Sequence, residues 1–214
     1  MQKKAPLAAA PSTPNDTREK VLDVSAQIFR FRGYSETTMK HIAEATGIKA
    51  ASIYYYFKSK DDLVEEVLNL GTLRVFDAVR QAIDSLPPET SFREKMVLAL
   101  QTHLKLLHTQ GDYTAANIRL FPEAPAPVVK RHMSVRRAYG QYWQEMLREG
   151  QAQGAIAKSL DVEITQMLLL GALNWSVQWY KPSLYQLEDV TASGISLLLD
   201  GLLHADEEAA NSEN

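Results

Sequence analysis

Residues 47–57, GIKAASIYYYF, bring three adjacent tyrosines directly after a run of small and basic side chains. Successive helical residues point about 100° apart, so three neighbours spread over most of a helix and cannot all face one core. We expect Tyr54 and Tyr55 to point outward, where their hydroxyls can reach phosphate oxygens. The alternative, that YYYF is simply the aromatic core of a small helical domain, is preferred for Ile53 and Phe57.

Residues 38–57 have the spacing of a helix-turn-helix. Ala43 stands where two crossing helices must come close, and Gly47 can adopt the left-handed turn conformation at little cost. The second helix would enter the major groove of DNA with its N-terminal residues nearest the bases. There, alanine methyl groups suit thymine, while lysine and serine can form hydrogen bonds to bases or phosphates.

Further contacts are expected on either side of that helix. Thr38 begins the preceding helix, where its hydroxyl and N–H can meet a phosphate, and two lysines follow the tyrosines. The candidate DNA contacts are Thr38, Lys49, Ala50, Ala51, Ser52, Tyr54, Tyr55, Tyr56, Lys58 and Lys60.

Catalysis and metal binding find no support in the sequence. There are no cysteines, which excludes disulfides and thiolate sites, and no hydrolase, dinucleotide, phosphate-loop or zinc-protease motif occurs. His103 and His108 are five residues apart, the wrong spacing for two metal ligands on one helix face. We therefore expect no enzyme activity, no metal and no cofactor.

The elements that position these residues all have helical periodicity, which predicts an all-α fold. Pattern breaks predict helices from residue 16 or 17 to Gly33, then short helices capped near Thr37 and following Gly47. They also predict a linking helix at 59–85 and helices near 91–110, 113–121, 126–152, 161–181 and 187–204. The expected organisation is a three-helix head (15–60), a larger helical body (61–204), and disordered tails at 1–14 and 205–214.

Composition is that of an ordinary globular chain, with 45% hydrophobic and 23% charged residues. A net charge of −3 excludes a uniformly basic coat but allows a local basic surface. The apolar stretch within the first 15 residues is too short for a signal peptide and is interrupted by proline. Residues 164–180 are too polar to span a membrane. We expect a cytoplasmic protein with no membrane partner.

The helix-turn-helix segment resembles the N-terminal signature of the TetR family. The resemblance runs from residue 17 to about 68 and is carried by Thr38, Ile42, Ala43, Gly47, Ile48, Ile53, Tyr54, Phe57, Lys60 and Leu63. Two positions depart from the pattern: Tyr56 stands where histidine is frequent, and Ala51 where glycine is frequent. The resemblance implies a homodimer that binds a palindromic operator in double-stranded DNA and releases it when a small molecule enters the body.

In this family the last two long helices usually form the dimer interface, which implies Leu168, Leu197, Leu198 and Leu202 as interface residues. The middle helices usually enclose the ligand, which makes His103, Asn117, Arg119, Phe121 and Trp143 pocket candidates. A reading of the apolar helices as core alone is the alternative to the dimer.

Residues 173–182, LNWSVQWYKP, resemble a segment of TetR-type regulators of fatty-acid, terpenoid and steroid breakdown, several of which respond to acyl-CoA thioesters. Trp175 and Trp179 form an aromatic edge there beside Asn174 and Gln178; ordinary packing is the alternative. Arginine side chains suit phosphates, so a basic cluster with Lys130, Arg131, Arg136 and Arg137 is a candidate for the CoA moiety; a solvated helix face is the alternative.

These observations predict a repressor that answers to a small hydrophobic effector, such as an acyl-CoA thioester. Two alternatives stay open: a DNA-binding interaction module without an effector, and a repressor that answers to an aromatic or drug-like ligand.

Overall fold

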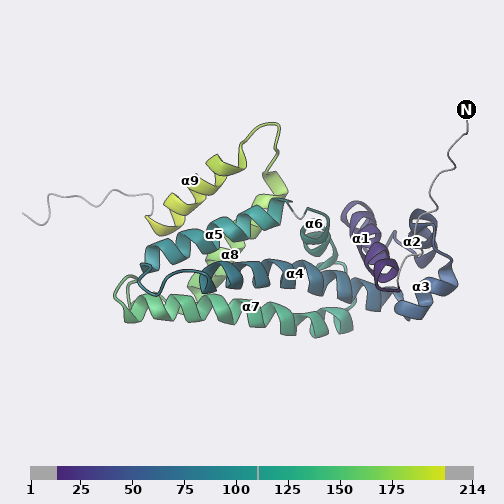
Figure 1. Ribbon diagram of the computed structural model, residues 1–214, viewed down its shortest axis with the longest axis horizontal. Helices are drawn as coiled ribbons and strands as arrows, with labels where there is room; N and C mark the ends of the chain where they lie inside the picture. Colours follow the sequence, from purple (N-terminus) through teal and green to yellow (C-terminus); the bar gives the residue numbers. More distant parts are fainter. Residues whose placement is uncertain (1–13, 110, 201–214) are drawn as a thin grey trace, which may run out of the picture. The chain divides into compact units, whose positions relative to one another are not determined.

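The computed structural model describes residues 14–109 and 111–200, and every regular element within those ranges is an α-helix (Figure 1). In chain order the helices are α1 (Pro14–Arg32), α2 (Met39–Thr46), α3 (Ala50–Tyr56), α4 (Lys60–Asp84), α5 (Phe92–Thr109), α6 (Gly111–Leu120), α7 (Ala126–Ala152), α8 (Val162–Trp179) and α9 (Leu187–Leu199). The all-α prediction is confirmed. The predicted tails lie outside the described residues, apart from Pro14. None of the described helices is long and apolar enough to cross a membrane.

The chain divides into two compact units. Among the described residues, the first unit holds 14–71 and 112–133, and the second holds 72–109, 111 and 134–200. The first unit therefore contains α1 to α3, the start of α4, nearly all of α6 and the first turns of α7.

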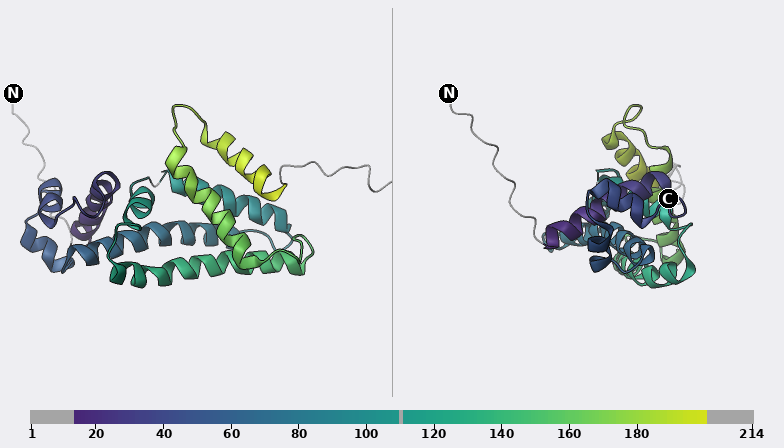
Figure 2. Two further views of the ribbon diagram at one scale, coloured as in Figure 1. Left: turned by 180° about the vertical axis from the view of Figure 1, so that it is seen from behind. Right: turned by 90° about the vertical axis from the view of Figure 1, so that its right-hand side faces the viewer.

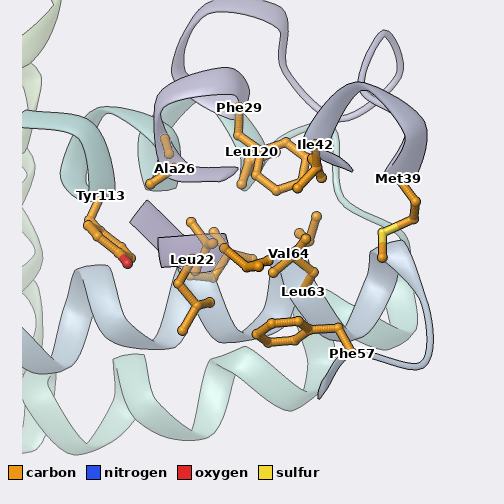
Figure 3. Close-up of a cluster of buried hydrophobic side chains, with 14 of the residues drawn as sticks. Leu22, Ala26, Phe29, Met39, Ile42, Phe57, Leu63, Val64, Tyr113 and Leu120 are labelled. Carbon is orange, nitrogen blue, oxygen red and sulfur yellow. The ribbon is translucent and has the colours of Figure 1, made fainter. Parts of the chain in front are cut away.

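The core of the first unit joins α1, the short helices and α6 (Figure 3). The apolar stripe of α1 is buried as its i, i+4, i+7 spacing predicts. Its members pack with side chains from the other helices of the unit. Figure 3 labels Leu22, Ala26, Phe29, Met39, Ile42, Phe57, Leu63, Val64, Tyr113 and Leu120 of this cluster.

Two helix starts in the first unit differ from the prediction. Helix α1 begins at Pro14, two or three residues early, because the fixed φ of proline suits a first helical turn and its missing N–H costs nothing there. Helix α2 is capped by Thr38 rather than Thr37. Thr37 is buried, and its hydroxyl donates to the carbonyl of Gly33 at 2.8 Å.

Helix α6 and the loop after it are tied to the rest of the first unit by polar contacts. The Asn117 side-chain amide donates to the carbonyl of Leu68 at 2.9 Å. The Glu123 carboxylate accepts from the backbone N–H of Tyr34 at 2.8 Å. These bonds fix α6 against α4 and fix the loop after α6 against the end of α1.

The core of the second unit is built on α5, which contacts both α8 and α9, the green and yellow helices in the left view of Figure 2. Trp143 of α7 and Leu100 of α5 are fully buried in this core, with Val79 of α4. Most of the surrounding side chains are aliphatic, which makes the few polar groups among them conspicuous.

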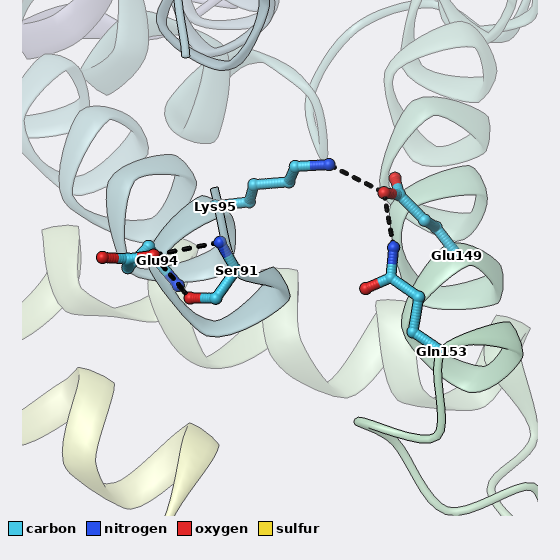
Figure 4. Close-up of polar contacts among 5 residues, drawn as sticks. All are labelled: Ser91, Glu94, Lys95, Glu149 and Gln153. Carbon is cyan, nitrogen blue, oxygen red and sulfur yellow. Dashed lines mark hydrogen bonds and ion pairs between the residues drawn. The ribbon is translucent and has the colours of Figure 1, made fainter. Parts of the chain in front are cut away.

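The start of α5 is closed by a capping box (Figure 4). The Ser91 hydroxyl accepts from the N–H of Glu94, whose carboxylate accepts in return from the N–H of Ser91 at 3.0 Å. The hydrogen bonds from Ser91 lower the pKa of Glu94. One residue on, the Lys95 ammonium pairs with Glu149 of α7 at 2.7 Å, and Gln153 donates to the same carboxylate. These contacts align α5 with α7.

Candidate nucleic-acid interface and effector site

Helices α2 and α3 are joined by a tight turn that has the geometry of a helix-turn-helix. The Thr38 hydroxyl accepts from the N–H of His41 at 3.2 Å and caps α2. Gly47 ends α2 with φ +68°, a conformation that side chains with a Cβ rarely adopt, and its N–H donates to the carbonyl of Glu44. The turn aims α3 away from α2 and leaves the N-terminus of α3 open to solvent.

Helix α3 has one buried side and one open side. Ile53 is fully buried and Phe57 nearly so, which matches the preference for core at these two positions. The open side is formed by Lys49, Ala50, Ala51, Ser52, Tyr54 and Tyr55, all exposed. Small residues at the N-terminal end allow close approach to another surface, and hydroxyl groups stand farther along the helix.

The three tyrosines differ in exposure, as expected for adjacent residues that point in different directions around a helix. Tyr55 is 82% exposed and Tyr54 is 49% exposed, whereas Tyr56 is half-buried against the first-unit core. The ring of Tyr56 meets that of Tyr55 edge to face, with centroids 5.2 Å apart. This contact supports the outward position of Tyr55. Of the three, Tyr54 and Tyr55 are exposed, and Tyr56 mainly packs.

Lys60, which was predicted as a phosphate contact, makes its contacts within the first unit. Its ammonium donates to the carbonyls of Tyr34 and Thr37, at 2.9 and 3.0 Å, and lies 3.7 Å from the centroid of the Tyr34 ring. The Tyr34 hydroxyl donates to Asp61, and burial together with this carboxylate raises the pKa of Tyr34 to about 12. Lys60 therefore holds the loop between α1 and α2 through two of its carbonyls. Lys58, in contrast, is exposed.

Replacing Lys60 by alanine should lower the free energy of unfolding of the first unit by about 1–2 kcal/mol, because two loop carbonyls lose a charged donor. Lys58→Ala, two residues away on the surface, should change it by less than about 0.5 kcal/mol. Urea unfolding followed by circular dichroism measures both variants. Equal stability of Lys60→Ala and the wild type would contradict this role.

A buried polar cluster lies within the second unit and joins α5, α7 and α8. His103 of α5 is 2% exposed; its Nδ1 is 2.8 Å from the Tyr139 hydroxyl and its Nε2 is 3.3 Å from Asn174 Oδ1. Because a carbonyl oxygen only accepts, Nε2 carries the proton and Nδ1 accepts from Tyr139. We call His103, Tyr139, Trp143 and Asn174 the buried polar cluster.

Both titratable members of the buried polar cluster are held neutral. Burial lowers the pKa of His103 to about 4, against the opposing effect of the hydrogen bond to Asn174; nearby His108 adds a smaller lowering. Burial also raises the pKa of Tyr139. The cluster therefore offers hydrogen bonds but no charge at neutral pH.

Trp143 is fully buried, and its indole N–H makes no hydrogen bond within the described part of the chain. Its ring stands edge-on to those of His103 and Tyr139, with centroids 6.2 Å away in both cases. The Trp143 side chain opposes the rise in the pKa of Tyr139 that burial causes.

The other predicted effector residues fall into three groups. Arg136 and Arg137 are exposed on α7, and the surroundings of Arg136 desolvate its guanidinium enough to lower its pKa. Asn117, Arg119 and Phe121 belong to the first unit. Asn117 bonds to α4, Arg119 pairs with Glu123 at 3.2 Å, and Phe121 packs against the first-unit core, so they are not part of the buried polar cluster.

The third group faces outward on α8. Gln178 is exposed, Trp179 is 43% exposed and Trp175 is 65% exposed. Tyr139, by contrast, was not predicted, although its sequence position gave a signal: it lies four residues before Trp143 and so shares a face of α7 with it.

Helix α8 exposes a continuous apolar face, which we call the α8 face. Its members recur at helical spacing and are Ile164, Met167, Leu168, Gly171, Trp175 and Trp179. Leu168 is 69% exposed, and no atom of the described residues lies within 4 Å of the position that a Cβ on Gly171 would take. On α9, Leu197 is exposed while Leu198 packs against the second-unit core; Leu202 lies outside the described residues.

Comparison with known proteins matches both ends of the chain to one family. Residues 21–67 match the family model "Bacterial regulatory proteins, tetR family", and residues 89–202 match "Tetracyclin repressor-like, C-terminal domain". The HTH-type transcriptional repressor KstR2 of Mycolicibacterium smegmatis is 28% identical over 195 residues, which cover 90% of this chain and 93% of the relative.

Two solved structures share the fold. The fatty acid degradation regulator FadR from Bacillus halodurans has a TM-score of 0.79 and 23% identity, over 92% of this chain and 100% of that one. The transcriptional regulator FadR from Bacillus subtilis, solved in complex with stearoyl-CoA, has a TM-score of 0.76 and 20% identity, over 86% of this chain and 99% of that one.

Proposed function

The chain belongs to the tetR family of bacterial regulatory proteins, and on this premise we propose that it is a transcriptional repressor that binds a palindromic operator as a homodimer and leaves it when an acyl-CoA thioester binds the second unit. The open side of α3 is the observation that carries the DNA-binding part. Its alanines permit close approach to base edges, Lys49 and Ser52 can form hydrogen bonds there, and Tyr54 and Tyr55 are exposed, so that their hydroxyls can reach phosphates.

The α8 face supports the homodimer. Monomers rarely expose large contiguous apolar patches, and this face carries two tryptophans. Glycine inside a helix costs about 1 kcal/mol relative to alanine, so the open position at Gly171 is understandable where another helix must approach closely. A second copy of this chain is the proposed occupant, because a palindromic operator requires a two-fold partner that carries the same reading helix.

The acyl-CoA effector rests on the second unit. Its core is apolar around the buried polar cluster, and two arginines stand on the surface of the same helix that supplies Tyr139 and Trp143. An apolar chain, a carbonyl and phosphates are the three parts of an acyl-CoA thioester that these features suit. The solved FadR from Bacillus subtilis contains stearoyl-CoA, which supports the same class of ligand for a related fold.

The test of this function is selection of bound fragments from genomic DNA by the purified protein at two salt concentrations. Recovery of one palindromic sequence that persists at the higher salt is expected, and stearoyl-CoA should release it. Recovery that is indifferent to sequence and lost at higher salt would contradict a repressor. If the protein binds one sequence specifically but no CoA thioester affects this binding, one of the two alternatives is favoured. These are a DNA-binding module without an effector and a repressor that responds to an aromatic or drug-like ligand.

On the recovered operator, Lys58→Ala should reduce the slope of log K against log salt by about one unit, because one phosphate contact is lost. Lys60→Ala should leave the slope unchanged, since the ammonium of Lys60 is held by two backbone carbonyls. Fluorescence anisotropy at four salt concentrations measures both slopes. If Lys60→Ala reduced the slope and Lys58→Ala did not, Lys60 and not Lys58 would be the phosphate contact.

A further inference from the structure

The buried polar cluster contains one donor more than it uses. The indole N–H of Trp143 is fully buried and makes no hydrogen bond to any described residue. A buried donor without an acceptor loses its bond to water and gains nothing, so such groups in native proteins usually have a partner in some state of the protein. The group that completes this cluster must bring an acceptor atom.

The chemistry of the cluster narrows the choice of acceptor. His103 and Tyr139 are already paired with each other, and Asn174 Oδ1 accepts from His103. None of the four members carries a charge at neutral pH. A carboxylate placed here would be buried without a cation, which is costly, whereas a neutral carbonyl oxygen would satisfy the donor at no such cost.

The order of residues along α7 suits one orientation of a bound acyl-CoA. Arg136, Tyr139 and Trp143 are spaced i, i+3, i+7 and so share one face of the helix. Arg136 is exposed at one end, and Trp143 is enclosed at the other by aliphatic side chains such as Leu100 and Leu147. Along α7, the cation of Arg136 is therefore followed by the buried polar cluster and then by the apolar core. The phosphates, the carbonyl and the acyl chain of an acyl-CoA follow one another in the same order.

We propose that the Trp143 indole N–H donates a hydrogen bond to the thioester carbonyl oxygen of the effector. Tyr139, His103 and Asn174 form the neutral polar surroundings of this bond. This inference rests on the proposed acyl-CoA effector and adds the contact that would distinguish a thioester, with its neutral carbonyl oxygen, from a charged carboxylate or a thioether. Asn174 is the half-buried member of the cluster, and its bond to His103 is the longer of the two, at 3.3 Å. It is the contact that yields when the ligand enters.

A matched pair of ligands tests the carbonyl alone. Stearoyl-CoA and S-octadecyl-CoA, its thioether analogue, share the phosphates and the eighteen-carbon chain and differ in the carbonyl oxygen. The wild-type chain should bind the thioester about fivefold to tenfold more tightly, the worth of one neutral hydrogen bond. In Trp143→Phe the two ligands should bind equally, whereas Phe31→Leu, which changes an exposed aromatic residue of the first unit, should keep the preference.

The same pair can be followed at the indole itself. The chain has three tryptophans, so a ¹⁵N-tryptophan spectrum contains three indole signals, and Trp143→Phe identifies one of them. Stearoyl-CoA should move the Trp143 signal downfield, as a new hydrogen bond does, while the thioether and free stearate should not produce that downfield change. This measurement uses the wild-type chain for the ligand comparison, so it holds even if the variant folds poorly.

The outcomes separate the two proposals. If both CoA compounds release operator DNA equally and the Trp143 signal does not respond to the carbonyl, the reading role of Trp143 is overturned and the acyl-CoA effector stands. If neither compound binds or releases DNA, the effector class and this inference both fail. A Trp143 signal already at a hydrogen-bonded position and unmoved by ligand would mean that a buried water satisfies the indole, which also overturns the inference.

Discussion

Replacing Leu168 by glutamate should leave each chain folded but raise the dissociation constant of the proposed homodimer by about a thousandfold or more. Leu168 is 69% exposed in the single chain, so a carboxylate there costs little before assembly. In a two-fold interface the substitution appears twice, and each buried, unpaired carboxylate opposes association by several kcal/mol. Operator affinity should fall with it, because one chain can occupy only a half-site.

Analytical ultracentrifugation at micromolar concentration measures the assembly, and circular dichroism checks the fold. Phe31→Glu is the matched control, since Phe31 is 74% exposed on α1 and belongs to the first unit, whereas the α8 face belongs to the second. That variant should remain a dimer. A dimeric Leu168→Glu protein would show that the α8 face is not the interface, and the exposed tryptophans would then need another explanation.

The stability of the second unit should decrease between pH 6.5 and 4 by about 3 kcal/mol because of His103. Its pKa falls from the ordinary value of 6.5 to about 4 on burial, so the unfolded chain binds the proton more readily than the folded one. The contribution of His103 is fully present above pH 6.5 and is lost as the pH falls toward 4, at about 1.4 kcal/mol per pH unit. His108, whose pKa burial also lowers, acts in the same direction.

Urea unfolding followed by tryptophan fluorescence measures this effect, since all three tryptophans belong to the second unit. His103→Gln should remove most of the slope between pH 6.5 and 5, a window chosen to lie above most carboxylate titrations. His41→Gln, a half-buried histidine of the first unit, should leave it unchanged. A slope equal to that of the wild type in His103→Gln would show that His103 is not the titrating group.

The helix-turn-helix could be predicted from the sequence because its signals are local. Gly47 ends α2 and Ser59 caps α4 through a bond from the N–H of Asp62, and such signals depend on neighbours within four residues. Helical periodicity likewise marked the buried stripe of α1. The family was recognisable on the same short segment, and the match of residues 21–67 confirms it.

The roles of Lys60 and Asn117 could not be predicted, since their partners are backbone carbonyls from distant parts of the chain. Lys60 bonds to residues 23 and 26 positions earlier, and Asn117 to one 49 positions earlier. A carbonyl leaves no mark in the sequence, because every residue has one. Periodicity shows which face of α6 is buried but not which helix covers it, so the grouping of α6 with the first unit emerged only from the structure.

The first unit completes its core with residues that are synthesised late. Tyr113, Ala116, Leu120 and Val128 pack with α1 to α4, yet residues 72–111 intervene in the chain. At the usual 5–20 residues per second, the ribosome takes roughly 3–12 s to pass from residue 71 to residue 133. During that time the nascent head exposes an unfinished apolar surface, so its folding on the ribosome must wait for α6, and a fragment ending at residue 71 lacks part of its own interior.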